Sequence, residues 1–188
     1  NSWGTFCSGE WHWGQTFTTG MSGQLESVDV HLTDLFGSGT PTYPSTVSIV
    51  NLVGSVPSGS ALGEVHVEAF VDGFNNVDFL SESIFLTAGM QYGIVISNDD
   101  PEPWDAGSVC WGVAESDVYS GGSLWNWHFE VGWNQDYSLP DFDFSKMDAA
   151  FRTHMVPEPA TIVILCFGYL GLIRKRQTRT AAARQFLN

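Results

Sequence analysis

Short stretches in which apolar and polar residues alternate run through most of the chain. Apolar residues at every second position mark one face of a half-buried strand. Such stretches occur at residues 28–32, 47–49, 65–69, 77–79 and 92–96. Turn-forming sequences separate them, and residues 1–155 show no sustained helical period. The pattern predicts an all-β body, an antiparallel sandwich or jelly roll, that the sequence "DAAFRT" at residues 148–153 closes.

The alternation ends ahead of a different kind of segment. Residues 160–173 are 14 uncharged, mostly apolar positions, and Pro157 and Pro159 mark their start. As a helix they would span about 21 Å, less than the roughly 30 Å of a hydrocarbon core, but flanking bases can snorkel and the bilayer can thin. The alternative is a buried terminal helix of a soluble domain. The run is apolar on all sides, with no polar stripe to face water, and this argues against that alternative. We expect a single transmembrane helix.

Formal charge is divided unevenly along the 188 residues. Residues 1–156 hold 20 acids and two bases, a charge of −18, whereas residues 157–188 hold five bases and one acid, a charge of +4. The bases that follow the apolar run predict a cytoplasmic end, with the body across the membrane. An acidic body repels phosphates, which excludes nucleic acid as its partner. The chain opens on Asn1, which removal of a signal peptide would explain.

The segment from Val156 onward resembles a known sorting signal. Its Val-Pro-Glu-Pro box consists of Val156, Pro157, Glu158 and Pro159. The apolar run follows, and then a basic cluster of Arg174, Lys175 and Arg176. In this order the three parts resemble the PEP-CTERM signal of exported proteins in Gram-negative bacteria that make exopolysaccharide. The resemblance implies processing at or near the box by an exosortase, a membrane transpeptidase. The extension to Asn188 is longer than such basic ends usually are.

The body resembles a second family, the choice-of-anchor R type domains. The likeness rests on the order of six stretches: "GQTFTTGMSGQLESVDVHL", "TVSIVNL", "ALGEVHVEAF", "IFLTAGMQYGIVIS", "YSGGSLW" and "DAAFRT". It implies an exported, non-enzymatic β-sandwich module. We therefore expect a sandwich domain, residues 1–153, and a sorting and anchor segment, residues 154–188. That segment divides into box 156–159, helix 160–173 and basic tail 174–188.

Eight tryptophans make aromatic side chains a candidate binding feature. Trp11 and Trp13, like Trp125 and Trp127, would share one face of an extended strand. Such rings commonly fill a core, but exposed ones can stack on sugars. The candidate glycan-binding residues lie in a Gly/Asn-rich, loop-like stretch and are Trp125, Trp127 and Trp133. Neighbouring candidates for holding sugar hydroxyls are Asn126, Asn134 and Asp136.

Cysteines and acids offer two further chemistries. In an oxidising compartment Cys7 and Cys110 can form a disulfide, and the alternative is two free thiols. Cys166, in the apolar run, reads as a packing residue. The acidic stretches 98–105 and 140–144 raise calcium as a cofactor, but neither has a calcium-loop spacing. We interpret both as solvated loops and expect no cofactor and no metal site.

No sequence motif indicates a reaction. The chain has no Gly-x-Ser-x-Gly elbow and no phosphate-binding loop, and its five histidines show no helical metal-ligand spacing. We expect no catalytic residues and a structural or adhesive protein of the cell surface or extracellular matrix. It would pass through an intermediate anchored in the inner membrane. The alternative is a carbohydrate-binding module retained in exopolysaccharide, and a third hypothesis is a hydrolase with an unrecognised site.

Overall fold

The computed structural model describes residues 3–7, 12–33, 44–98, 110–114, 119–128, 132–135 and 147–158. Within these ranges the fold is all-β, with one three-residue 3-10 helix, η1 (Leu80–Glu82). Every pair of strands whose register is described is antiparallel. Residues 1–156 form one compact unit and residues 157–188 a second.

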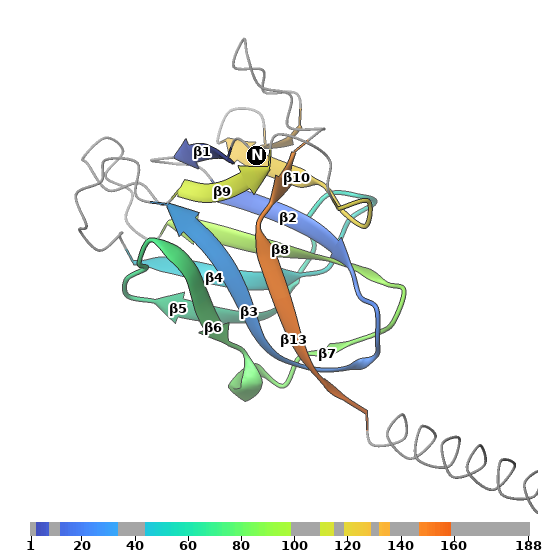
Figure 1. Cartoon of the computed structure of the whole chain (residues 1–188). Coiled ribbons are helices and arrows are strands. Elements are labelled where there is room, and N and C mark those ends of the chain that lie inside the picture. The colour runs from blue at the N-terminus through green and yellow to red at the C-terminus, as the bar shows by residue number, and fades with distance from the viewer. Residues whose placement is uncertain are drawn as a thin grey trace, which may run out of the picture. The chain divides into compact units, whose positions relative to one another are not determined.

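Sheet A is built around β3, its longest strand. Its order is β1-β9-β3-β13, while β6 and β7 also pair with β3 and β12 pairs with β9. Figure 1 shows β3, β6 and β13 together in one layer, in front of β2, β4 and β8. The strands of sheet A are β1 (Trp3–Cys7), β3 (Gly23–Thr33), β6 (Gly73–Asp78), β7 (Phe85–Leu86), β9 (Cys110–Ala114), β12 (Asp148–Ala149) and β13 (Phe151–Pro157).

Sheet B has six strands in the order β11-β10-β2-β8-β4-β5. Its strands β2, β8 and β4 lie at the centre and pair over nearly their whole length. The strands are β2 (His12–Thr18), β4 (Ser45–Val50), β5 (Ala61–Val67), β8 (Gln91–Asn98), β10 (Leu124–His128) and β11 (Gly132–Asn134).

The two sheets enclose one hydrophobic core, which confirms the antiparallel sandwich. Alternate residues of β3 and of the strands of sheet B point into it, as the alternation predicted. Fully buried members include Val28 and Val30 from sheet A and Val47, Ile49 and Ile94 from sheet B. Burial of apolar surface between the sheets is the main stabilising contribution.

Two strands differ from the sequence expectation. β5 ends at Val67, so Ala69 lies beyond it and is exposed although it continues the alternation. In β8 the residues 92–96 are all buried, and the loop of residues 51–60 covers Gly93 on the outer face of sheet B. A Cβ atom on Gly93 would lie 2.7 Å from Cβ of Pro57 in that loop.

A buried polar bridge joins the sheets through the core. Gln15 in β2 is fully buried, and its Oε1 accepts a hydrogen bond of 2.8 Å from the backbone N–H of Ala149. Its Nε2 donates to Oδ1 of Asp148 at 3.2 Å. The second carboxylate oxygen of Asp148 accepts from the N–H of Tyr119 at 2.8 Å. Because β12 belongs to sheet A, the Gln15 side chain links sheet B to sheet A. Both its amide oxygen and its amide nitrogen are hydrogen-bonded.

We name one end of the sandwich the base: the β2–β3 turn at residues 19–22, residues 79–90, and the end of β13. The N–H of Thr19 donates to the carbonyl of Met90 at 3.0 Å, and the N–H of Ala88 donates to Oγ of Ser22 at 2.9 Å. Figure 1 shows η1, β7 and the end of β13 at this same end of the sandwich. The chain therefore leaves the body at its base, where β13 ends and residue 158 follows.

Replacing Gln15 with Leu should lower the free energy of unfolding by about 2 to 4 kcal/mol, because the Ala149 N–H and the Asp148 carboxylate lose a buried partner. Urea unfolding of the purified protein measures this. The matched control is Gln91→Leu, an exposed residue whose Nε2 donates to the carbonyl of Gly121 at 3.3 Å, and it should change stability by less than about 0.5 kcal/mol. Equal effects of the two substitutions would contradict this role of the bridge.

Candidate functional site

The first half of the Val-Pro-Glu-Pro box belongs to a strand. Val156 and Pro157 are the last two residues of β13, and Glu158 follows them directly. The sandwich thus extends past the boundary expected at residue 153, to residue 156. Pro159, the run 160–173 with Cys166, and Arg174, Lys175 and Arg176 lie outside the described residues. The box therefore begins on the folded body, with no linker ahead of it.

Contacts across the outer face of sheet A hold β13 in place. Nε2 of His154 lies 2.9 Å from Oδ2 of Asp29 in β3, and Nδ2 of Asn76 donates to Oδ1 of Asp29 at 2.7 Å. Burial raises the pKa of Asp29, but the hydrogen bonds from Asn76 and His154 outweigh it, so that this pKa lies below its ordinary value. The guanidinium of Arg152 lies 4.1 Å from the ring centroid of Phe74 in β6. Two strands, β3 and β6, thus hold β13 where it leads into the box.

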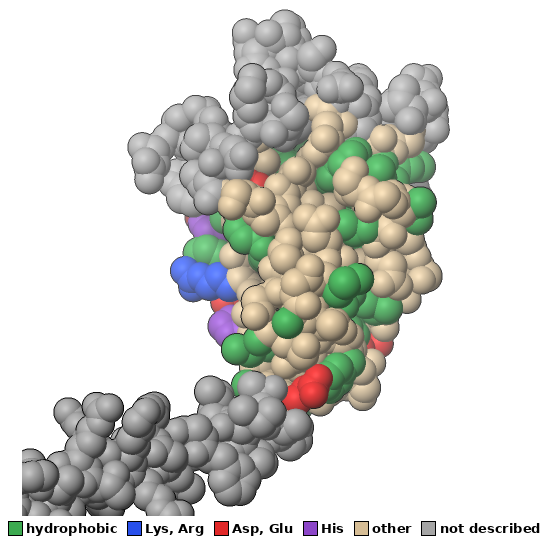
Figure 2. All heavy atoms as spheres, turned by 90° about the vertical axis from the view of Figure 1, so that its right-hand side faces the viewer, with side chains coloured by type: hydrophobic (Ala, Val, Ile, Leu, Met, Phe, Trp, Pro, Cys, Tyr) green, Lys and Arg blue, Asp and Glu red, His purple; other side chains and the backbone are tan. Residues whose placement is uncertain are grey.

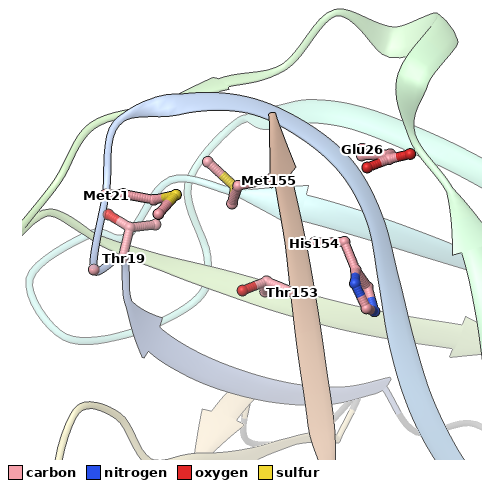
Figure 3. Close-up of a pocket in the computed structure, with 7 residues that line it drawn as sticks. Thr19, Met21, Glu26, Thr153, His154 and Met155 are labelled. Atoms are coloured by element: carbon pink, nitrogen blue, oxygen red, sulfur yellow. The ribbon is translucent and has the colours of Figure 1, made fainter. Parts of the chain in front are cut away.

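A shallow pocket of about 420 Å³ opens at the base beside β13. Its lining comes from the β2–β3 turn, from β3 and from β13. Figure 3 shows Met21 and Met155 near one another, with His154 and Glu26 on the other side of β13. Its wall is mixed: two methionine and two threonine side chains lie beside one glutamate and one histidine. The described residues include no group of three His, Cys, Asp or Glu side chains arranged to hold a metal ion.

Three tryptophans gather on the outer face of sheet B. Trp125 and Trp127 alternate in β10 with Leu124 and Asn126, which are fully buried, so the two indoles belong to the opposite, outer face. Trp127 pairs with Trp133 of β11. We call these three residues, with His12, Gly14 and Pro57, the tryptophan face.

Glycine and proline from distant parts of the chain shape the tryptophan face. A Cβ atom on Gly14 would lie 2.9 Å from Cζ3 of Trp133 and 2.8 Å from Cγ of Pro57. The missing side chain therefore lets both rings rest on the backbone of β2. His12, opposite Trp127 in the β2–β10 register, packs against it with ring centroids 4.6 Å apart and ring planes tilted by 50°.

This arrangement corrects parts of the sequence interpretation. Trp125, Trp127 and Trp133 lie in the strands β10 and β11 and not in a loop. Trp13, spaced from Trp11 as Trp127 is from Trp125, is a core residue. Asn126 faces the core and is fully buried, so it lies on the opposite side of the sheet from the indoles. Trp11 and Asp136 lie outside the described residues, as do the acidic stretches apart from Asn98, the last residue of β8.

The tryptophan face is only partly open. All three indoles are half-buried, and burial lowers the pKa of His12, which favours its neutral form. Nδ1 of His12 and Nε1 of Trp125 are buried without a hydrogen-bond partner in the described parts of the chain. Sequence reasoning missed His12, Gly14 and Pro57, although an isolated glycine in a strand pattern is a signal of close packing.

The two body cysteines occupy opposed backbone positions in the β1–β9 ladder. Cys7 is the register partner of Cys110. Directly opposed residues of an antiparallel pair have Cα atoms about 4.5 to 5.5 Å apart, within the range of roughly 4.4 to 6.8 Å that a disulfide needs. The backbone register therefore satisfies the distance condition for the expected bridge.

No helix in the described ranges is both long and apolar enough to cross a membrane. No known protein-family model matches the chain, and none of the curated proteins matches it. Its function must therefore be argued from its own residues.

We expect Cys7 and Cys110 to form a disulfide in an oxidising environment. Alkylation without reductant should then leave both unmodified in mass spectrometry, and Cys7→Ser should lower the free energy of unfolding by about 2 to 5 kcal/mol because the bridge closes a long loop. Cys166→Ser serves as the control and should leave the stability of the body unchanged. Full alkylation of Cys7 and Cys110 before reduction would contradict the bridge.

Proposed function

We propose that this chain is an exported, non-enzymatic protein of the cell surface or extracellular matrix, sorted through a PEP-CTERM-type signal. The observation that carries the proposal is the direct passage of β13 into the Pro-Glu-Pro box, followed by the apolar run and the basic cluster. The box, the apolar span and the basic cluster are the three parts of the signal that the sequence resembles, and they occur in its order. The organism would be a Gram-negative bacterium.

The charge distribution supports one orientation of the chain. Residues 160–173 would cross the inner membrane with Arg174, Lys175 and Arg176 held in the cytoplasm. The body, with its charge of −18 over residues 1–156, would lie on the other side. The box would then lie at the outer surface of the inner membrane, within reach of a membrane transpeptidase of the exosortase type.

The proposal gives the sandwich a structural or adhesive role and no reaction. Its polar core groups at Gln15 and Asp148 are engaged with each other and with the backbone, which suits a scaffold. The pocket at the base is lined by thioether and hydroxyl groups more than by acids and bases. No cofactor, calcium included, is part of this proposal.

The chain contains a matched internal control for the sorting box. Pro101, Glu102 and Pro103 repeat the sequence Pro-Glu-Pro within the body, but no apolar run follows them. In the proposed route the tripeptide acts only at the membrane surface, because the transpeptidase is a membrane protein. The second copy should therefore be ignored.

Replacing Pro157 and Glu158 with Ala should leave the chain unprocessed in the inner membrane of the producing bacterium. Immunoblotting of inner-membrane and extracellular fractions measures this. The variant with Pro101 and Glu102 replaced by Ala should mature like the unmodified protein. Normal maturation of the first variant would mean that the box is incidental.

Carbohydrate binding by the tryptophan face is a second candidate function. The favouring observation is that Trp125, Trp127 and Trp133 share one face of sheet B, where indole rings can stack on a sugar. A glycan array, with the exopolysaccharide of the producer included, tests it. Trp127→Ala should abolish binding while the protein stays folded by circular dichroism, although loss of the packed indole lowers its unfolding midpoint. Phe85→Ala, which removes an exposed ring at the base, should bind normally. Absence of binding by the unmodified protein would remove this candidate.

A further inference from the structure

Exposed apolar side chains concentrate at the base of the body. Among the described residues the large exposed ones are Met21, Val53, Leu62, Val71, Phe74, Leu80, Phe85, Met90 and Val156. Five of these belong to the base, at 43% to 56% exposure: Met21, Leu80, Phe85, Met90 and Val156. Scattered surface residues of this kind need no explanation, but a cluster at one end of a domain marks an interaction surface.

Backbone pairing and hydrogen bonds place the segments that carry these five residues next to one another at the base. Phe85 pairs with Gln24 of β3, and the Gln24 side chain donates to the carbonyl of Leu80 at 3.2 Å. Met90 is bonded through its carbonyl to Thr19, which lines the basal pocket with Met21. Met155, the neighbour of Val156, lines the same pocket. Figure 2 shows separate hydrophobic side chains on one face of the body, with acidic side chains beside them at its lower end.

Chain length limits how far the base can lie from the apolar run. Three residues lead from Pro157 at the end of β13 to Ala160, the first residue of that run. Fully extended, they reach at most about 10 Å. If residues 160–173 cross a bilayer, as the proposed function has it, the base must therefore lie at the headgroups.

Charge selects the kind of membrane surface. Described acids at or beside the base are Glu26, Asp78, Glu82 and Glu158. Among the described residues the single Lys or Arg is Arg152, which lies near the opposite end of β13. Carboxylates without neighbouring cations are repelled by anionic lipid headgroups. A zwitterionic leaflet carries no such net charge, and exposed Met, Leu and Phe side chains can enter its boundary with the acyl chains.

We propose that the base is a membrane-docking surface that seats the body on a zwitterionic leaflet through Met21, Leu80, Phe85 and Met90. This inference rests on the proposed membrane-spanning role of residues 160–173. Docking fixes the orientation of the body, so that the end of β13 and the box that follows are presented at the bilayer surface. The exposed apolar side chains of the base then form a second membrane contact beside the spanning segment.

Methionine oxidation tests this docking in the full-length chain. Peroxide oxidises exposed thioethers faster than shielded ones, so Met21 and Met90 report on the base. Val71 lies in the β5–β6 connection at the opposite end and is 68% exposed, so Val71→Met adds a reporter there. In phosphatidylcholine nanodiscs, peptide mass spectrometry should find Met21 and Met90 oxidised several-fold more slowly than the methionine introduced at position 71.

A second variant separates docking from simple tethering. Leu80→Glu with Phe85→Glu, added to the reporter chain, should keep the chain in the nanodisc but restore fast oxidation of Met21 and Met90. Slow oxidation that persists in this variant, or fast oxidation at the base of the parent chain within nanodiscs, would overturn the docking surface and leave the spanning helix standing. A chain that does not co-elute with nanodiscs would overturn the spanning role and the docking surface together.

Discussion

The absence of any linker between the last strand and the Pro-Glu-Pro box constrains everything else in this account. β13 is held on sheet A by the His154–Asp29 contact and by Arg152 over Phe74, and it keeps strand geometry up to Pro157. Whatever acts on the box must therefore approach the base of a folded domain. The box begins in the last two residues of this strand, beyond the last residue that packs against the core, so cleavage within it removes no core residue.

The two outer faces of the sandwich are built differently, and this difference divides their roles. The outer face of sheet A carries polar and charged contacts that fix β13. That of sheet B is covered by the loop of residues 51–60 and by half-buried indoles, so that a second apolar layer lies outside β2 and β8. Gly14 and Gly93 permit this layer, because a side chain at either position would collide with Pro57. The layer stabilises sheet B whether or not its tryptophans also contact a sugar.

Much of the fold could be predicted from the sequence, because one face of most strands is buried and the period of two is then visible. The alternation located β3, β4 and β8, and the spacing of Trp125 and Trp127 placed both indoles on one face. It did not predict that glycine and asparagine near these residues would sit in strands, because their pairing with β2 and β11 overrides local propensity. The packing of Pro57 on Gly14 was also out of reach, since it joins residues far apart in the chain through tertiary contacts alone.

The central claim is that the chain is sorted by removal of its apolar and basic end. Mass spectrometry of the carboxyl terminus of the protein, isolated from the matrix or surface of the producing bacterium, tests this most directly. The account predicts a mature terminus at or near residues 156–159, with Arg174, Lys175 and Arg176 absent. Recovery of the chain from the cytosol, dissolved and with these three bases still attached, would contradict it.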